Sequence, residues 1–470
     1  MDGDPTSYDI VAYPANIFPL THPDHLAVIA RLHGLDAPPV ATARVLEIGG
    51  GDGVNLIAAA AAYPEASFFS FDLSSVAVAR GKAFASAAGL TNIRIEVADI
   101  LDAAVTLAGP FDYVIAHGVY AWVPGAVRRA IMALVGRVLA REGVAFISYN
   151  ALPGGHLRRV VRDLLLHHVG DIADPAERVA RARDVLIDFA TPRENDRVVM
   201  AGIRDVARPM LRQEIETLYH DELSPVWAPQ ALTDVVAAAN AAGLGFLNDA
   251  SPALVYDGLP GKTLDDAAVV RDAQTSDFGS MVFFHQTLLV HAGRQPARSV
   301  CLAALPSLFV ASKAQRSGPD RFKLGDDEFA VGDSVLADGI EALGKIWPRR
   351  LPVSGIADTP DRCEALFRLF AVDAVSLHSV PMPGVAVPGP RPVANPAARA
   401  QIAAGAVYLF TLDHRMVAMP NPGPRAFMTL LDGSRDRARL AADWAASAFG
   451  GEIDPETALH QLALAGFILH

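Results

Sequence analysis

The chain has 470 residues, and 51% of them are hydrophobic. A chain of this length exceeds what one compact core usually holds, so we expect two or three domains. No apolar run approaches the roughly 18–20 residues of a membrane-spanning helix, and the acidic residues 1–5 do not resemble a signal peptide. With 40 Lys and Arg against 52 Asp and Glu, the net charge of −12 argues against a protein that binds nucleic acid phosphates. We therefore expect a soluble, cytoplasmic protein without membrane insertion.

Strands alternate with helices in the first 160 residues. Apolar, β-prone runs predict strands at residues 45–48, 67–71, 93–97, 111–116 and 144–149, and helical spacing predicts helices at residues 54–62, 75–88 and 127–139. This alternation predicts an α/β fold with a doubly wound, mostly parallel, Rossmann-like sheet. Ligands of such sheets bind beyond the carboxyl ends of the strands.

The turn after the first strand is a glycine cluster, Gly49-Gly50-Gly51-Asp52-Gly53. Glycines let the backbone approach a ligand closely and adopt positive φ without steric cost. A dinucleotide-binding turn needs G-x-G-x-x-G, whereas this cluster reads G-x-G-x-G and follows the acidic Glu47. An acid there would repel a pyrophosphate but would tolerate a positively charged nucleoside.

Two further acids stand at the ends of the next two strands. Asp72 lies 25 residues after Glu47, where a carboxylate can accept both hydroxyls of a ribose. Asp99 ends the third strand, where it can accept from an adenine amino group. Three acids around one glycine turn predict a site for S-adenosylmethionine. The alternative for Asp72 and Asp99 is that each caps the helix that follows.

These motifs resemble a known family. Residues 45–53, 71–74 and 98–100 are similar to the motifs of class I S-adenosylmethionine-dependent methyltransferases. A closer resemblance is to bacterial methyltransferases with a methyltransferase regulatory domain, some of which methylate lysines of outer-membrane proteins. It is carried by residues 8–23, 116–124, 148–156, 219–223 and 430–436. Where that family usually has Pro-Gly-Trp-His, this chain has Pro153-Gly154-Gly155-His156, and the missing Trp could widen the acceptor channel.

The motifs and the resemblance together imply S-adenosylmethionine as the cofactor. The implied contacts are Tyr13, His22, Glu47, Gly49, Gly51, Gly53, Asp72, Leu73, Asp99, Ile100 and His117. We expect Tyr13 and His22 to belong to an N-terminal arm that folds over the cofactor, although Thr21 and Asp24 also fit the start of a helix. The His22–His25 and His167–His168 pairs lack a third ligand signal, so no metal site is predicted.

Methyl transfer from a sulfonium is an in-line displacement, so the enzyme must hold the acceptor close and keep its lone pair free. We expect positioning groups at the ends of the fourth and fifth strands, and the candidate catalytic residues are Tyr120, His117, Asn150 and Trp122. Tyr120 would orient an acceptor nitrogen, and the Trp122 ring would form an aromatic wall beside it. The alternative is that both are ordinary packing aromatics between the loop and the following helix. His117 fits a cofactor contact better than a base. Asn150 either holds the acceptor or satisfies buried backbone.

The rest of the chain predicts further parts. Helical spacing at residues 157–169, 176–189 and 196–218 indicates a helical insert, and residues 243–248 and 281–290 are candidates for an antiparallel strand pair. Residues 397–470 resemble a small winged-helix-like domain without a basic cluster, which favours a protein-interaction or dimerisation module. The predicted boundaries are 1–165 for the arm and the cofactor-binding domain, 166–300 for the helical insert and regulatory region, and 301–470 for the C-terminal α+β, winged-helix-like region.

The sequence thus predicts an S-adenosylmethionine-dependent N-methyltransferase that acts on an amine, with a lysine of a protein or peptide as the favoured acceptor. The alternatives are methylation of a peptide N-terminus or a small-molecule amine, and a non-catalytic protein that senses the cofactor. The expected partner is a protein or peptide that presents an amine, and a homodimer is an open alternative.

Overall fold

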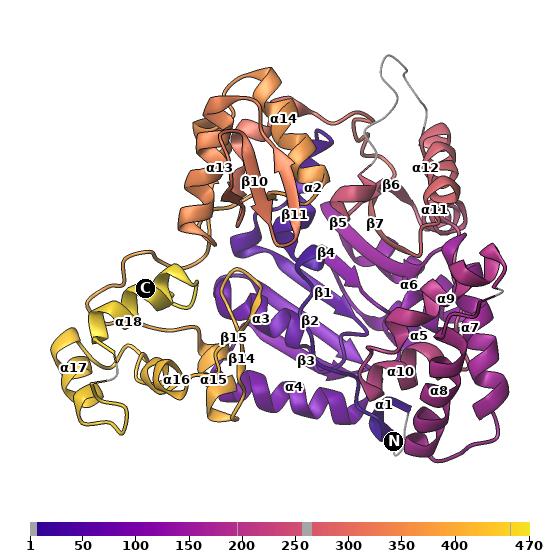
Figure 1. Cartoon of the computed structure of the whole chain (residues 1–470), viewed down its shortest axis with the longest axis horizontal. Coiled ribbons are helices and arrows are strands. Elements are labelled where there is room, and N and C mark those ends of the chain that lie inside the picture. The colour runs from indigo at the N-terminus through magenta and orange to yellow at the C-terminus, as the bar shows by residue number, and fades with distance from the viewer. Residues whose placement is uncertain (1–6, 195, 256–265, 452) are drawn as a thin grey trace.

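The computed structural model of the chain describes residues 7–194, 196–255, 266–451 and 453–470. A seven-stranded sheet of order β3-β2-β1-β4-β5-β7-β6 forms its centre (Figure 1). The strands are β1 Arg44–Ile48, β2 Ser67–Asp72, β3 Ile93–Val97, β4 Phe111–Ala116, β5 Leu139–Asn150, β6 Leu244–Asp249 and β7 Phe284–His291. The first five strands are parallel, and β7 runs antiparallel to both β5 and β6. The predicted Rossmann-like sheet and its closing strand pair are therefore confirmed.

Helices cover both faces of this sheet. The first layer contains α2 Pro23–Leu32, α3 Val54–Ala62 and α4 Ser75–Ala87, and the second contains α5 Ile100–Thr106, α6 Gly125–Val138 and α11 Leu232–Ala241. Side chains alternate along each strand, so Val45 packs in the first layer while Leu46 and Ile48 pack in the second. Every residue of α3 is buried, which its small alanine side chains permit. The buried α3 fixes the glycine turn before it against the sheet.

The helical insert is confirmed as α7 Gly154–Val169, α8 Pro175–Ala190, α9 Val198–Met210 and α10 Ile215–Leu223, which share a core of their own. Glu222 is fully buried there and accepts from Arg158 Nη2 at 2.6 Å. The single helix predicted at residues 196–218 is in fact two. Pro209 has no N–H to donate, and α9 ends one residue after it. A further helix, α12 Asp266–Ser280, packs on α11.

Residues 301–380 pack against the first helical layer. They form α13 Ser334–Ile346, α14 Pro360–Ala371, the sheet β12 Leu351–Pro352, β8 Phe309–Ala311 and β13 Ser376–His378, and the meander β9 Gln315–Arg316, β10 Arg321–Leu324 and β11 Asp327–Ala330. Phe370 and Leu377 lie in the same hydrophobic core as Leu26 of α2 and Phe146 of β5. This part of the chain and the central sheet therefore stabilise each other.

The final segment has a separate core around the buried Trp444. It contains α15 Pro396–Ala403, β14 Tyr408–Phe410, β15 Met416–Ala418, α16 Pro422–Thr429, α17 Arg437–Ala445 and α18 Pro455–Leu464. Asn or Asp side chains cap all four helices, as at Asn395, whose Oδ1 accepts from Ala397 N. Figure 1 shows α15 and the β14–β15 hairpin beside α3 and α4, and these contacts dock the segment on the sheet.

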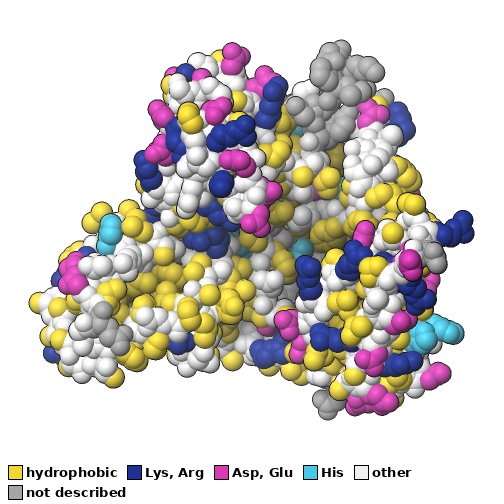
Figure 2. Space-filling model, in the orientation of Figure 1, with side chains coloured by type: hydrophobic (Ala, Val, Ile, Leu, Met, Phe, Trp, Pro, Cys, Tyr) yellow, Lys and Arg dark blue, Asp and Glu magenta, His cyan; other side chains and the backbone are white. Residues whose placement is uncertain are grey.

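Surface side chains differ between the parts of the molecule. In Figure 2 hydrophobic side chains dominate the face of the C-terminal segment at the lower left, whereas Lys, Arg, Asp and Glu intermingle over the helical insert. Among the described residues no helix is long and apolar enough to cross a bilayer.

Candidate functional site

A cavity of about 680 Å³ opens at the carboxyl ends of β1, β2, β3 and β4. Its walls come from the N-terminal arm, the glycine turn, the loops after β2, β3 and β4, and the insert, which contributes Arg158 and Asp221. The arm includes α1 Ser7–Ile10 and the 3-10 turn η1 Pro19–Thr21. The position matches the expectation for a ligand site of a doubly wound sheet.

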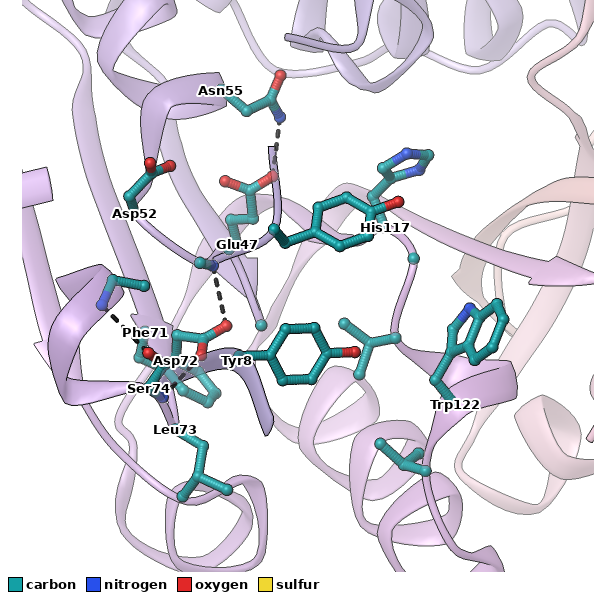
Figure 3. A pocket seen from close by; sticks show the side chains of 18 of the residues that line it. Tyr8, Glu47, Asp52, Asn55, Phe71, Asp72, Leu73, Ser74, His117 and Trp122 are labelled. Carbon is teal, nitrogen blue, oxygen red and sulfur yellow. Dashed lines mark hydrogen bonds between the residues drawn. The ribbon is translucent and has the colours of Figure 1, made fainter. Parts of the chain in front are cut away.

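The glycine turn holds its shape through its backbone. Gly49 has φ +69°, and a Cβ there would lie 2.5 Å from Val119 Cγ2, so no other residue fits. Gly49 N donates to Phe71 O at 2.9 Å, and Gly51 N donates to Asp72 Oδ2 at 2.9 Å. These bonds join the turn to the end of β2, so the backbone of the turn and the Asp72 carboxylate face one cavity (Figure 3).

Glu47, the penultimate residue of β1, lines the cavity and is only 3% exposed. Its Oε1 accepts from Asn55 Nδ2 at 2.8 Å, while Oε2 has no hydrogen-bond partner among the described residues. Burial raises the pKa of this carboxyl to about 7, against the hydrogen bond from Asn55, and the charges of Asp52 and Asp72 raise it further. A buried carboxylate with one free oxygen is suited to a ligand that carries positive charge.

Asp72 and Asp99 have different local roles. Asp72 accepts from Gly51 N and, at 2.8 Å, from Ser74 N, and burial raises the pKa of its carboxyl. It does not cap α4, since that cap is Ser74. Asp99 does cap α5, because its Oδ1 accepts from Leu101 N at 2.6 Å, and it also lines the cavity. Each oxygen of Asp72 accepts from one backbone N–H and keeps a lone pair for a further donor.

The N-terminal arm lies across the cavity and is attached to α10. The Tyr8 ring stacks on His220 with centroids 4.3 Å apart, and Tyr13 Oη donates to Asp221 Oδ1 at 3.3 Å. His220 Nε2 donates to Val11 O at 2.7 Å. Burial raises the pKa of Asp221 to about 6 and that of Tyr8 to about 12. The arm and the insert thus form a wall of aromatic rings around one carboxyl group.

The loops after β4 and β5 supply the opposite wall. His117 Nδ1 lies 3.0 Å from Ser148 Oγ, and burial lowers the pKa of its ring to about 4, so the ring is neutral at pH 7. Asn150 Oδ1 accepts from Trp227 Nε1 at 3.0 Å, which fixes the orientation of its amide. The Trp122 ring lies 6.5 Å from that of Trp227. Figure 3 shows Tyr8, His117 and Trp122 around the same space, with Asp72 beyond Tyr8.

The structure brings most of the predicted residues together. Those that line the cavity are Tyr13, Glu47, Gly49, Gly51, Asp72, Leu73, Asp99, Ile100, His117, Trp122 and Asn150. Leu73 and Ile100, each next in the chain to one of the two acids Asp72 and Asp99, add apolar surface to the lining.

Three predicted residues do not line the cavity. His22 caps α2 through Asp24 N and lies between the rings of Tyr63 and His414. Gly53 has φ +70° and begins α3 behind the turn. The Tyr120 ring is 3% exposed and packs 6.1 Å from that of Tyr149, because the 3-10 turn η3 Tyr120–Trp122 directs it into the core.

Tyr8, like Tyr13, was expected in an N-terminal arm over the cofactor, and it lines the cavity, whereas Asn55, Arg158, Asp221 and Phe284 of the lining were not predicted. Asn55 follows Glu47 by eight residues at the start of a helix, and that spacing was a usable signal. Asp221 stands in a segment that carried the family resemblance, but its place beside the arm depends on how α10 packs.

Comparison with known proteins gives two family matches. Residues 45–143 match the model of a methyltransferase domain, and residues 390–463 match the PKMT C-terminal winged helix domain. The second match confirms the predicted winged-helix-like domain.

Two curated relatives come from Rickettsia prowazekii (strain Madrid E), and both are uncharacterized. RP789 is 33% identical over 294 residues, covering 61% of this chain and 53% of that protein. RP028 is 34% identical over 221 residues, covering 47% of this chain and 88% of that protein. The match therefore spans about half the length of the first relative and most of the second.

Among solved structures, PKMT2 from Rickettsia typhi matches with a TM-score of 0.80 and 21% identity, covering 97% of this chain and 100% of that one. The same protein in complex with AdoHcy matches with a TM-score of 0.79 and 20% identity, covering 97% of this chain and 100% of that one. At this identity the likeness establishes the fold, which is shared over nearly the whole chain.

Proposed function

Because the chain belongs to the S-adenosylmethionine-dependent methyltransferases that end in a PKMT C-terminal winged helix domain, we propose that it methylates the side-chain amine of a lysine in a protein or peptide. One observation carries this choice of acceptor. The wall formed by the arm and the insert places the Asp221 carboxyl beside the rings of Tyr8 and Tyr13, with the Arg158 guanidinium 3.9 Å away. A carboxylate among aromatic rings is suited to an alkylammonium group.

The residues at the carboxyl ends of β1, β2 and β3 fit the cofactor. Glu47 offers an unpaired buried oxygen to its positive charge, Asp72 keeps lone pairs for ribose hydroxyls, and Asp99 can accept from the adenine amino group. When bound, S-adenosylmethionine supplies an activated methyl group on a sulfonium. PKMT2, whose fold this chain shares, was solved in complex with AdoHcy, which supports S-adenosylmethionine as the cofactor.

The acceptor must be deprotonated before it attacks. An unperturbed lysine has a pKa of about 10.4, so presenting its neutral form at pH 7 costs about 4.6 kcal/mol. Enclosure between Tyr8 and Trp122 disfavours the charged amine and lowers this cost. Asp221, whose pKa burial raises to about 6, is placed to hold the ammonium and take up its proton. Asn150, in the opposite wall, has its amide oriented by Trp227 and would orient the amine from that side.

A peptide assay with labelled S-adenosylmethionine tests the proposal, with mass spectrometry to locate the methyl group. Three versions of each candidate peptide are compared: unmodified, with lysines replaced by arginine, and with an acetylated N-terminus. We expect transfer to the unmodified and acetylated peptides and none to the arginine peptide. Methylation lost on acetylation would instead identify an N-terminal acceptor. Cofactor binding without transfer to any peptide or small amine would favour a sensor.

Two further proposals concern the compartment in which the protein works and the surface of its C-terminal segment. We propose that the protein works in the cytoplasm, because nothing in its composition suits a membrane or an oxidising compartment. We also propose that residues 390–470 contact the substrate protein or a second copy of the chain, because that face is rich in hydrophobic side chains (Figure 2).

A further inference from the structure

Asn55, in the first turn of α3, joins four segments of the chain. Its Nδ2 donates to Glu47 Oε1 at 2.8 Å and to Thr21 Oγ1 at 3.0 Å. Its Oδ1 accepts from Phe18 N at 3.0 Å and from His414 Nε2 at 3.0 Å. The side chain is 4% exposed, and both hydrogens and both lone pairs of its amide are used. The arm, β1, α3 and the C-terminal domain therefore meet at one amide group.

These bonds fix the orientation of the amide and the tautomer of the histidine. Both amide hydrogens point at oxygens, so Oδ1 is the acceptor and His414 must donate from Nε2. Burial holds the pKa of His414 well below its usual range, so the ring is neutral and Nδ1 carries no proton. Nδ1 has no hydrogen-bond partner among the described residues. The bond to Asn55 is thus the one polar contact recorded for this buried ring.

The backbone around His414 is specialised. His414 lies in the turn between β14 and β15 with φ +60°, a region that glycine or asparagine adopts more readily. Thr411 N and Arg415 O close the turn at 2.9 Å, and Arg415 N donates to Thr411 Oγ1 at 3.1 Å. A residue held in a costly conformation by its surroundings often serves function. Here the turn directs an imidazole of the C-terminal domain at a residue of the cofactor cavity.

Asn55 connects His414 to the cofactor site, because the same amide bonds to both His414 and Glu47. It is the only recorded hydrogen-bond donor to Glu47 Oε1 among the described residues, and Figure 3 shows the two side chains joined at the back of the cavity. A rotated Asn55 amide would place its oxygen against the carboxylate, which would repel it. The position and the charge of Glu47 therefore depend on the orientation that His414 supports.

We propose that His414 is a positioning residue for S-adenosylmethionine: it orients Asn55, and Asn55 holds Glu47 in the geometry that binds the cofactor. Docking of the winged-helix domain on the sheet and cofactor binding are therefore coupled. Coupling of this kind is reciprocal, so a protein partner that draws the β14–β15 turn away from α3 weakens cofactor binding.

Substitutions at His414 in the full chain test this coupling, with the dissociation constant for S-adenosylhomocysteine measured by calorimetry. Gln places an N–H where histidine has Nε2, whereas Asn suits the left-handed backbone but is too short to reach Asn55. We expect His414→Asn to weaken binding about tenfold and His414→Gln to stay within about threefold of wild type. Trp444→Phe is the control, since it removes the bond from Trp444 Nε1 to Ile453 O inside the same domain. It should bind normally.

The proposal fails if His414→Asn binds like wild type, or if Trp444→Phe weakens binding as much as His414→Asn. Hydrogen exchange of the wild-type protein provides a test that needs no variant. Saturation with S-adenosylhomocysteine should slow exchange of the amides at residues 411–415 and leave those of α17 unchanged. Unchanged exchange in the turn, or equal slowing in α17, would overturn the coupling.

Discussion

At the scale of single residues, the site concentrates buried carboxyl groups that cost folding free energy. Glu47, Asp72 and Asp221 all have their pKa raised by burial. Burial disfavours the charged form of these groups, so a bound cation or a further hydrogen-bond donor would stabilise them. Their accumulation around one cavity distinguishes it from the rest of the surface.

Cofactor binding should depend on pH through Glu47. Burial raises the pKa of this carboxyl from 4.5 to about 7, so the free protein is stabilised by protonation and loses that stability as pH rises through about 7. A cationic cofactor prefers the ionised form, so affinity should rise up to about tenfold from pH 6 to pH 8. Calorimetry between pH 6 and pH 8 measures this change in affinity for S-adenosylmethionine. Glu47→Gln should bind weakly with a flat profile, and an unchanged slope in that variant would assign the titration elsewhere.

Asp72 should contribute strongly to cofactor affinity. Asp72→Asn keeps the shape of the side chain but loses the charge, and its amide cannot accept from both Gly51 N and Ser74 N. Weakening a charge-assisted pair costs about 1.5–3 kcal/mol, which corresponds to a ten- to hundredfold loss of affinity. Asp102→Asn, on the exposed side of α5, is the matched control and should bind normally. Wild-type affinity in Asp72→Asn would remove Asp72 from the cofactor site.

Residues of the site were predictable where their roles are local in the chain. The glycine turn, Glu47 and Asp72 lie at the ends of strands that read as short apolar, β-prone runs, so their places at the strand ends follow directly. His22 and Tyr120 depend on tertiary packing, because each ring turns away from the cavity into a neighbouring layer. The partnership of Asn55 with His414 spans 359 residues, and no local pattern encodes it.

At the scale of elements, the strands were easier to predict than the points at which one helix ends and the next begins. The antiparallel pair β6 and β7 follows from two short apolar runs, whereas the break between α9 and α10 depends on Pro209 and on the core that both helices share. The attachment of α2 to residues 301–380 was also missed. Asp24 accepts there from Arg350 Nη1 at 3.0 Å, His378 Nδ1 at 2.8 Å and Ser379 Oγ at 2.7 Å.

Removing the Asp24 carboxylate should loosen this attachment. Burial alone would raise the pKa of Asp24, but Arg350 and His378 hold this pKa well below its usual range. Its contribution to stability is therefore present above about pH 4 and lost only in stronger acid. Asp24→Ala leaves the buried Arg350 without its carboxylate partner and should cost about 3–5 kcal/mol in urea unfolding at pH 7. Asp338→Ala, which breaks an exposed pair with Arg316, should change stability little.

At the scale of the whole molecule, the predicted boundary at residue 300 crosses a continuous core. Leu308, Val310 and Phe370 pack with Leu26 and Phe146, whereas the segment around Trp444 has a core of its own. Contacts between distant parts of a chain leave little trace in sequence, so this sharing could not be predicted. The division into three domains remains a prediction about how the chain unfolds.

Two shortened chains test that division. A chain that ends at residue 300 exposes the apolar face of α2 and should fail to melt cooperatively in circular dichroism. A chain that ends at residue 388 keeps the shared core and should melt cooperatively, although it lacks His414. Cooperative melting of the shorter chain would show that residues 1–300 fold alone.

The arm across the cavity has a kinetic consequence. Ser74 Oγ donates to Asp9 Oδ1 at 2.6 Å, and together with the Tyr8–His220 stack this fastens the arm to both sides of the opening. We expect the spent nucleoside to leave after these contacts break, so release of S-adenosylhomocysteine, and not methyl transfer, should limit turnover. Rapid-quench experiments should then show a burst of methylated product equal to the enzyme concentration. Tyr8→Ala should speed the release of S-adenosylhomocysteine and abolish the burst, because the arm would no longer slow the step that limits turnover.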